Sequence, residues 1–200
     1  MPRAKQRTPE LRAHILEVAT ATLADEGVAG FTTRRVASEA GTSVPAVYEL
    51  FGDKAGLVRE LFFEGFRQLR QRLDPLEATT DPVADLIGIV NVFRAFARDH
   101  PTLAAVMFSR PFADFDPGPE ELAAGSAVRS FVVEHVRRGA DVGLFTDDPT
   151  DIAHVLLAMM QGLATQESAG WLGTSRESID RRWALGPLAF LAGLALAERQ

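Results

Sequence analysis

Apolar residues recur every three or four positions along most of this chain, which is the spacing that places side chains on one face of an α-helix. The first such series begins after Thr8, which can cap a helix, and Pro9, which suits its first position. Gly27 marks its end. A longer series covers residues 54–73, until Pro75 stops it. Both series predict amphipathic helices.

Between these two series the chain divides into shorter units joined by a tight turn. Thr32 or Thr33 can accept a hydrogen bond from the free amides that open a first short helix. Gly41 ends it, because glycine takes a left-handed backbone without strain. Thr42 or Ser43 can cap the next helix, which apolar residues at 47 and 51 would anchor. This layout is that of a helix-turn-helix DNA-binding unit, although an ordinary helical hairpin is the plainer alternative.

Beyond residue 80 the pattern remains helical. Helices are predicted from Asp81-Pro82 to His100, from Pro101 through Phe108, from Pro119 to Gly139, from Asp148 to about Glu167, and from Glu177 to Glu198 with a kink at Pro187, with a loop at 109–118. No segment shows sustained alternation, so we predict no strands. The expected fold is all-α, with a three-helix helix-turn-helix domain over residues 1–56 and a helical ligand-binding and dimerisation domain over residues 57–200.

The second short helix is the one suited to enter a major groove of DNA. Its outward residues are Val44, Pro45 and Ala46 near its start and Tyr48 further along. The hydroxyl of Tyr48 can donate a hydrogen bond to a phosphate oxygen. Lys54 lies at a helix N-terminus, where backbone amides already favour an anion.

The segment at roughly residues 9–60 resembles the TetR family of transcriptional regulators. The matching positions are Gly27, Phe31, Thr33, Val36, Ala37, Ala40, Gly41, Tyr48, Phe51, Lys54 and Leu57. The resemblance implies a homodimer that binds operator DNA and usually represses transcription, until a ligand in the C-terminal domain releases it.

The resemblance also implies roles for single residues. Thr33 and Arg34 would touch phosphates, Val44, Pro45 and Ala46 would face base edges, and Tyr48 and Lys54 would hold the DNA backbone. The chain departs from the family at Val44, where a polar or basic residue is frequent, and at Leu50, where histidine or tyrosine is frequent. Glu49 adds an acid that could accept from a cytosine amino group. We therefore expect base readout through thymine methyls and DNA shape.

The net charge of −6 argues at first against a nucleic-acid partner, but its distribution does not. Residues 1–60 carry 8 Lys and Arg against 8 Asp and Glu, so the acidity belongs to residues 61–200, with 13 against 19. Residues 1–12 alone have a net charge of +3, which suits either a DNA-binding tail or a solubilising terminus. With no apolar leader and no run of about 18 apolar residues, we expect a cytoplasmic protein without a membrane span.

The residues of the last two long helices suggest that the chain pairs with a second copy of itself. Small residues crowd the final helix: Ala184, Gly186, Ala189, Ala192, Gly193, Ala195 and Ala197. The helix before it is strongly apolar: Ile152, Val155, Leu156, Met159, Met160 and Leu163. Burial within one bundle would explain both patterns. We favour a homodimer whose two-fold face is a four-helix bundle, because its two heads would then reach the half-sites of a pseudo-palindromic operator.

Aromatic and methionine residues in the C-terminal part suggest a pocket for a small-molecule effector. Its apolar walls would be Phe93, Phe96, Met107, Phe108, Phe112, Met159 and Met160, and its orienting groups His100, Gln161 and Gln166. Plain core packing is the alternative for each of them. The series from 93 to 108 also looks like a known subtype of C-terminal regulatory domain, which implies helices around an internal cavity. Because few charged residues are candidates for burial there, the expected ligand is mainly apolar.

Catalytic patterns are absent from the sequence. No two of the four histidines are four residues apart, and there is no phosphate-binding glycine motif, nucleophile elbow or cysteine. We therefore predict no enzyme activity, no cofactor and no metal site. The prediction is a ligand-responsive, TetR-like repressor, and the alternative is a dimeric helical ligand-binding protein whose DNA-binding head is vestigial.

Overall fold

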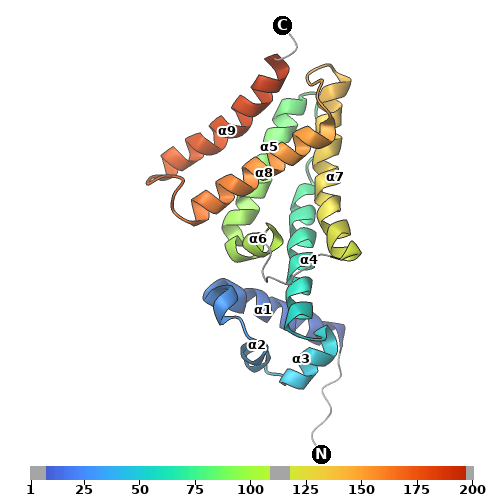
Figure 1. The fold of residues 1–200 in the computed structure, drawn as a ribbon, viewed down its shortest axis with the longest axis vertical. Coiled ribbons are helices and arrows are strands. Elements are labelled where there is room, and N and C mark those ends of the chain that lie inside the picture. Colours follow the sequence, from blue (N-terminus) through green and yellow to red (C-terminus); the bar gives the residue numbers. More distant parts are fainter. Residues whose placement is uncertain (1–7, 109–117, 197–200) are drawn as a thin grey trace, which may run out of the picture. The chain divides into compact units, whose positions relative to one another are not determined.

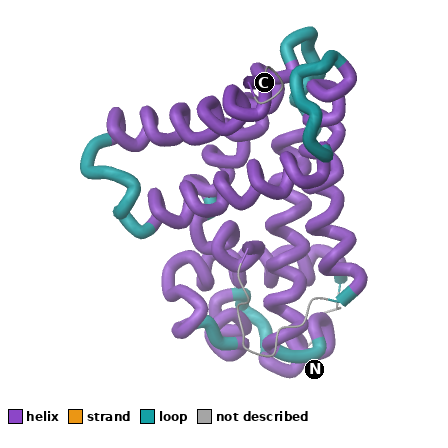
Figure 2. Tube along the Cα trace, turned by 45° about the horizontal axis from the view of Figure 1, so that its top comes forward, coloured by secondary structure: helices purple, strands orange, loops and turns teal. Residues whose placement is uncertain are grey.

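The computed structural model describes residues 8–108 and 118–196. Within these ranges the chain forms helices without strands, which confirms the predicted all-α fold (Figures 1 and 2). The helices are α1 (Pro9–Gly30), α2 (Thr33–Glu39), α3 (Val44–Phe51), α4 (Lys54–Leu73), α5 (Pro82–Asp99), α6 (Pro101–Phe108), α7 (Pro119–Asp141), α8 (Pro149–Ser168) and α9 (Arg176–Leu196). The predicted loop at 109–118 falls almost wholly outside the described residues.

The described helices belong to two compact units. The first comprises residues 1–65 and 102–121, and the second comprises residues 66–101 and 122–200. The division therefore falls inside α4, between Gly65 and Phe66.

In the first unit, side-chain caps fix where the short helices begin. The hydroxyl of Thr32 accepts from the Arg35 amide at 3.2 Å, and that of Ser43 accepts from the Ala46 amide at 3.3 Å. The sequence left open whether Thr32 or Thr33 caps α2 and whether Thr42 or Ser43 caps α3, and these bonds identify Thr32 and Ser43 as the caps. Gly41 has φ 61, as the predicted turn requires.

The first helix ends later than its pattern indicates. Gly27 has φ 65 and ψ −178, so the regular helix breaks at the predicted residue. One further turn follows, and α1 ends at Gly30, where the Phe31 amide donates to the Gly27 carbonyl at 3.2 Å.

In the second unit, α5 lies against α8 and α9 (Figure 1). Six apolar residues at helical spacing along α5 are buried: Leu86, Ile89, Val90, Phe93, Phe96 and Ala97. From α8, Ile152, Leu156 and Met160 are buried as well. The loop at residues 169–175 joins α8 to α9, and the two helices lie side by side in opposite directions (Figures 1 and 2).

A buried carboxylate fastens the start of α5. The Asp85 side chain is 4% exposed, pairs with Arg138 Nη1 at 2.6 Å, and accepts from the amide and hydroxyl of Thr79 at 2.9 and 2.7 Å. Burial alone raises the pKa of this carboxyl, but the hydrogen bonds from Thr79 and Arg138 together outweigh it, so the pKa lies below its usual value.

We expect Asp85→Asn to lower the stability at pH 7 by roughly 2–3 kcal/mol, because Arg138 loses its charged partner. A carboxyl whose pKa is depressed on folding contributes stability above its unfolded pKa of about 3.9, and this contribution is lost as the pH falls through the lower folded value. Thermal melts by circular dichroism should therefore show a gap between wild type and variant that narrows below about pH 4. Asp74→Asn, at an exposed carboxylate paired with Arg70, is the matched control and should change little. A gap of equal size at pH 3 and pH 7 would contradict this account.

Candidate nucleic-acid interface and effector groove

One face of α3 is held in the core of the first unit and the other is open. Val47 and Phe51 are buried, whereas Pro45 and Glu49 are exposed and Tyr48 is 45% exposed. Val44 and Ala46, at the start of the helix, are half-buried. An exposed tyrosine on a short, capped helix leaves its hydroxyl available to a partner outside the molecule.

At the start of α2, the two residues with an expected phosphate contact lie differently. Thr33 is buried, whereas Arg34 is exposed. The neighbouring Arg35 is exposed but engaged, with its Nε 2.6 Å from Glu39 Oε1 and its Nη2 2.8 Å from Glu26 Oε1. Among the described residues Arg34 has no ion-pair partner, so its guanidinium is the one on α2 that remains free for an anion.

Glu39 ties α2 to α1. It accepts hydrogen bonds from Arg35 and, at 2.8 Å, from the hydroxyl of the buried Thr22. Its hydrogen bond from Arg35 holds the pKa of Glu39 below its usual value, and the bond from Thr22 adds to this effect. The same bond to Glu39 raises the pKa of Arg35. Arg35 is therefore a positioning residue, because its ion pairs with Glu39 and Glu26 help to orient α2, the helix that carries Arg34.

Two further cations of this unit lie over aromatic rings. Lys54 Nζ is 5.9 Å from the ring centroid of Phe31. The Arg12 guanidinium lies 5.1 Å from the ring centroid of Phe51 and pairs with Glu60 at 2.6 Å. Of the basic residues predicted to form a tail, Arg12 is thus part of the folded unit, and the other three lie outside the described residues.

The residues predicted to bind an effector belong to both units. Phe93, Phe96 and Met160 are buried in the second unit, where His100 and Gln161 are half-buried. Met107 is buried and Phe108 half-buried in the first unit, and Phe112 lies outside the described residues. His100 is engaged, because Arg72 Nη2 donates to its Nε2 at 3.1 Å.

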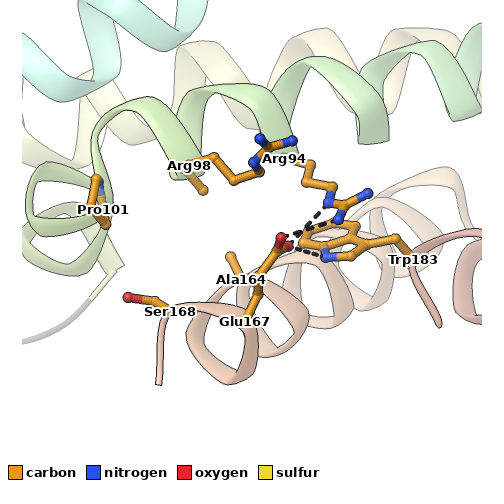
Figure 3. Close-up of a pocket in the computed structure, with 8 residues that line it drawn as sticks. Arg94, Arg98, Pro101, Ala164, Glu167, Ser168 and Trp183 are labelled. Atoms are coloured by element: carbon orange, nitrogen blue, oxygen red, sulfur yellow. Dashed lines mark hydrogen bonds and ion pairs between the residues drawn. The ribbon is translucent and has the colours of Figure 1, made fainter. Parts of the chain in front are cut away.

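The structure instead shows a groove between α5, α8 and α9, entirely within the second unit (Figure 3). One part has a volume of about 300 Å³ and is lined by Arg94, Ala97, Arg98, Pro101, Ala164, Glu167, Ser168 and Trp183. A second part of about 200 Å³ shares Arg94, Arg98 and Glu167 and adds Thr174, Ser175, Arg176 and Ile179. None of the predicted effector residues lines either part.

An ion-pair network forms the wall of this groove. Arg94 Nε and Nη2 donate to the two Glu167 oxygens at 3.0 and 3.1 Å (Figure 3). Nη2 also lies 2.7 Å from Asp180 Oδ1. The indole N–H of Trp183 donates to Glu167 as well. Burial opposes the charge on Arg94, but its hydrogen bonds to Glu167 and Asp180 outweigh this effect and raise its pKa. One signal for this site was in the sequence, since Arg94 and Arg98 are four residues apart and share a helix face.

The described part of the chain offers neither a metal site nor a membrane-spanning helix. It holds no group of three or more His, Asp or Glu side chains that could bind a metal ion. None of its helices combines the length and the apolar character that crossing a membrane requires.

A helix-turn-helix unit followed by a larger helical part is the architecture of a class of DNA-binding regulators. A model of the tetR family of bacterial regulatory proteins matches residues 15–61, and a model of the tetracyclin repressor-like C-terminal domain matches residues 86–186. The chain therefore belongs to the TetR family, and the predicted resemblance is confirmed for both parts of the chain.

Individual proteins are similar to this chain in sequence or in fold. The HTH-type transcriptional regulator Rv1816 of Mycobacterium tuberculosis is 28% identical over 125 residues, which are 60% of this chain and 52% of that protein. The chain thus spans about half the length of that relative. A protein of unknown function from Rhodococcus sp. RHA1 has the same fold, with a TM-score of 0.81 and 28% identity over 96% of this chain and 99% of that one. The TetR family transcriptional regulator PfmR from Thermus thermophilus shares the fold with a TM-score of 0.70 and 19% identity, over 90% and 98% of the two chains.

Proposed function

We propose that this chain is a repressor that binds a pseudo-palindromic operator as a homodimer and is released by a small molecule. Residues 1–56 would form its DNA-binding domain and residues 57–200 its effector-binding and dimerisation domain. The observation that carries the proposal is the open face of α3, where Pro45, Tyr48 and Glu49 are exposed on a helix anchored by Val47 and Phe51. The family assignment adds to it, and it favours regulation over catalysis.

The proposed dimer rests on an apolar stripe on the outer side of α9. Leu185 and Leu188 are 67% and 47% exposed, and Ala189 and Ala192 are exposed at the same helical spacing. On the neighbouring α8, Val155 is exposed too. Contiguous exposed apolar surface of this kind marks an interaction site, and a second copy of the same face is its simplest partner.

Selection from a random duplex pool tests the proposal most directly. The purified dimer should enrich a two-fold symmetric sequence, with half-sites about one helical turn or a multiple of it apart. Its affinity for that duplex should fall steeply as salt is raised, since phosphate contacts release counterions. A protein that enriches no sequence and is not retained on duplex DNA at low salt would instead fit a ligand-binding protein with a vestigial head.

Within the interface, we expect Tyr48 and Val44 to contribute in different ways. Tyr48→Phe removes one hydroxyl, and we expect it to weaken binding about 3- to 10-fold on the selected duplex and on random duplexes alike, because a phosphate contact carries no sequence information. Val44→Ala should change the ratio between these duplexes and leave random-duplex binding nearly unchanged. Fluorescence anisotropy at fixed salt measures both ratios. If the two substitutions lowered both affinities by the same factor, the proposed division between backbone and base contacts would be wrong.

A further inference from the structure

The groove between α5, α8 and α9 has an excess of positive charge, which is largest in its smaller part. Arg98 lines both of its parts and Arg176 lines the smaller one. In the ranges that the structure describes, neither arginine has a hydrogen bond or an ion pair from its side chain. The acids of this region are already engaged, because Glu167 accepts from Arg94 and Trp183, and Asp180 pairs with Arg94. Asp99, whose charge acts on Arg98, pairs with Arg72 at 2.6 Å.

Counting the charged groups shows that this excess is not neutralised locally. The smaller part is lined by three arginines and a single carboxylate, that of Glu167. Including Asp180, which pairs with Arg94 outside the lining, still leaves one positive charge in excess, although the whole chain has a net charge of −6. Two guanidinium groups at one small cavity favour an anion, and their planar forks fit a carboxylate in particular.

The larger part of the groove also offers apolar contacts. Ala97, Pro101, Ala164 and the ring of Trp183 line it beside Arg94, Arg98, Glu167 and Ser168. Its volume of about 300 Å³ is at the lower limit of known small-molecule sites. A ligand that fits both parts is therefore small, carries a negative charge for the arginines and has a short apolar portion.

We propose that this groove binds a small carboxylate with a short apolar chain, its carboxylate on Arg98 and Arg176 and its chain against Ala97, Pro101 and Trp183. The binding site stands on its own geometry. That its occupant acts as the effector rests on the proposed function.

Binding can be measured without DNA, with sodium hexanoate as the probe. Trp183 lines the groove and Trp171 is exposed, so the variant Trp171→Phe leaves a single reporter tryptophan at the site. Hexanoate should change its fluorescence in a saturable manner and give a matching isotherm by calorimetry. Hexan-1-ol, which lacks the charge, and acetate, which lacks the chain, should each bind at least about tenfold more weakly. Equal affinity for hexanoate and hexan-1-ol, or no saturable binding of hexanoate, would overturn the proposal.

Substitutions locate the carboxylate. Arg98→Gln and Arg176→Gln should each weaken hexanoate binding about tenfold, because each removes a charge-assisted contact. Arg181→Gln is the matched control on α9, since Arg181 is exposed and pairs with Glu177 at 2.7 Å. The same loss in all three variants would overturn the proposal, because it would indicate general electrostatic attraction. If the protein binds hexanoate but no DNA, the proposed site is supported and the proposed repressor function is contradicted. If it binds DNA but not hexanoate, the repressor function is supported and the site is contradicted.

Discussion

Replacing Leu185 and Leu188 together by glutamate is expected to convert the protein into a monomer and to lower its affinity for the selected duplex at least about 100-fold. Both side chains are exposed on the outer stripe of α9, so the substitutions remove no contact within the subunit core. In a two-fold interface each introduced carboxylate would be desolvated and would approach its symmetry copies. Loss of the second head would remove the gain in affinity that comes from binding two half-sites at once.

Sedimentation equilibrium measures whether the variant is a monomer, and fluorescence anisotropy measures its affinity for the selected duplex. Binding to a single half-site should be unchanged, because the DNA-binding face is intact. Leu122→Glu is the control, since Leu122 is an equally exposed leucine on α7, away from the stripe. If the double variant stayed dimeric, or if Leu122→Glu dissociated the protein as well, the stripe on α9 would not be the dimer face.

The small residues of α9 show what the sequence could and could not predict here. It grouped Gly186, Ala189 and Ala192 into one set suited to close helix packing. In the fold a Cβ on Gly186 would lie 3.2 Å from Met159 Sδ of α8, so this glycine permits an internal contact. Ala189 and Ala192 are exposed. Composition alone cannot distinguish a small residue that permits packing inside the subunit from one that lies on its surface, because it does not show which face of a helix is covered by neighbouring helices.

Local physics made most of the fold predictable. Thr8 caps α1 through the Leu11 amide at 3.3 Å, Asp53 caps α4 through the Gly56 amide at 2.7 Å, and prolines open α5, α6 and α8. Each of these signals acts within three or four residues, so it can be read without knowledge of the tertiary structure. The open face of α3 follows from the same spacing, since Val47 and Phe51 are four residues apart.

The groove could not be found in this way. Its central ion pair joins Arg94 to Glu167, 73 residues further along the chain, and no short motif links them. The spacing of Arg94 and Arg98 shows that they share a face, but not that the acids beside them are already engaged. Aromatic and methionine content points to Phe93, Phe96 and Met160, which are buried and do not line this groove.

Breaking the ion pair between Arg94 and Glu167 is the second change for which we expect a large effect, here on the stability of the fold. Their side chains are 15% and 17% exposed, and together with Trp183 they join α5, α8 and α9. Arg94→Ala leaves the Glu167 carboxylate largely buried without its cation, and we expect a loss of roughly 3 kcal/mol. For a chain of this length such a loss corresponds to a fall in Tm of roughly 6–12 °C. Differential scanning calorimetry at pH 7 measures it.

The double variant Arg94→Met with Glu167→Gln decides whether this cost comes from the unpaired charge or from lost packing. The glutamine amide oxygen can still accept from the indole N–H of Trp183, and the methionine fills the space of the arginine stem, so the charge is removed without leaving that donor unpaired. We therefore expect the double variant to recover at least about half of the loss in Tm. Arg181→Ala, which breaks the exposed pair with Glu177, should stay within about 0.5 kcal/mol of wild type. A double variant less stable than Arg94→Ala would mean that the network acts mainly through shape and hydrogen-bond geometry, in which case the charge of Glu167 is not what holds the three helices together.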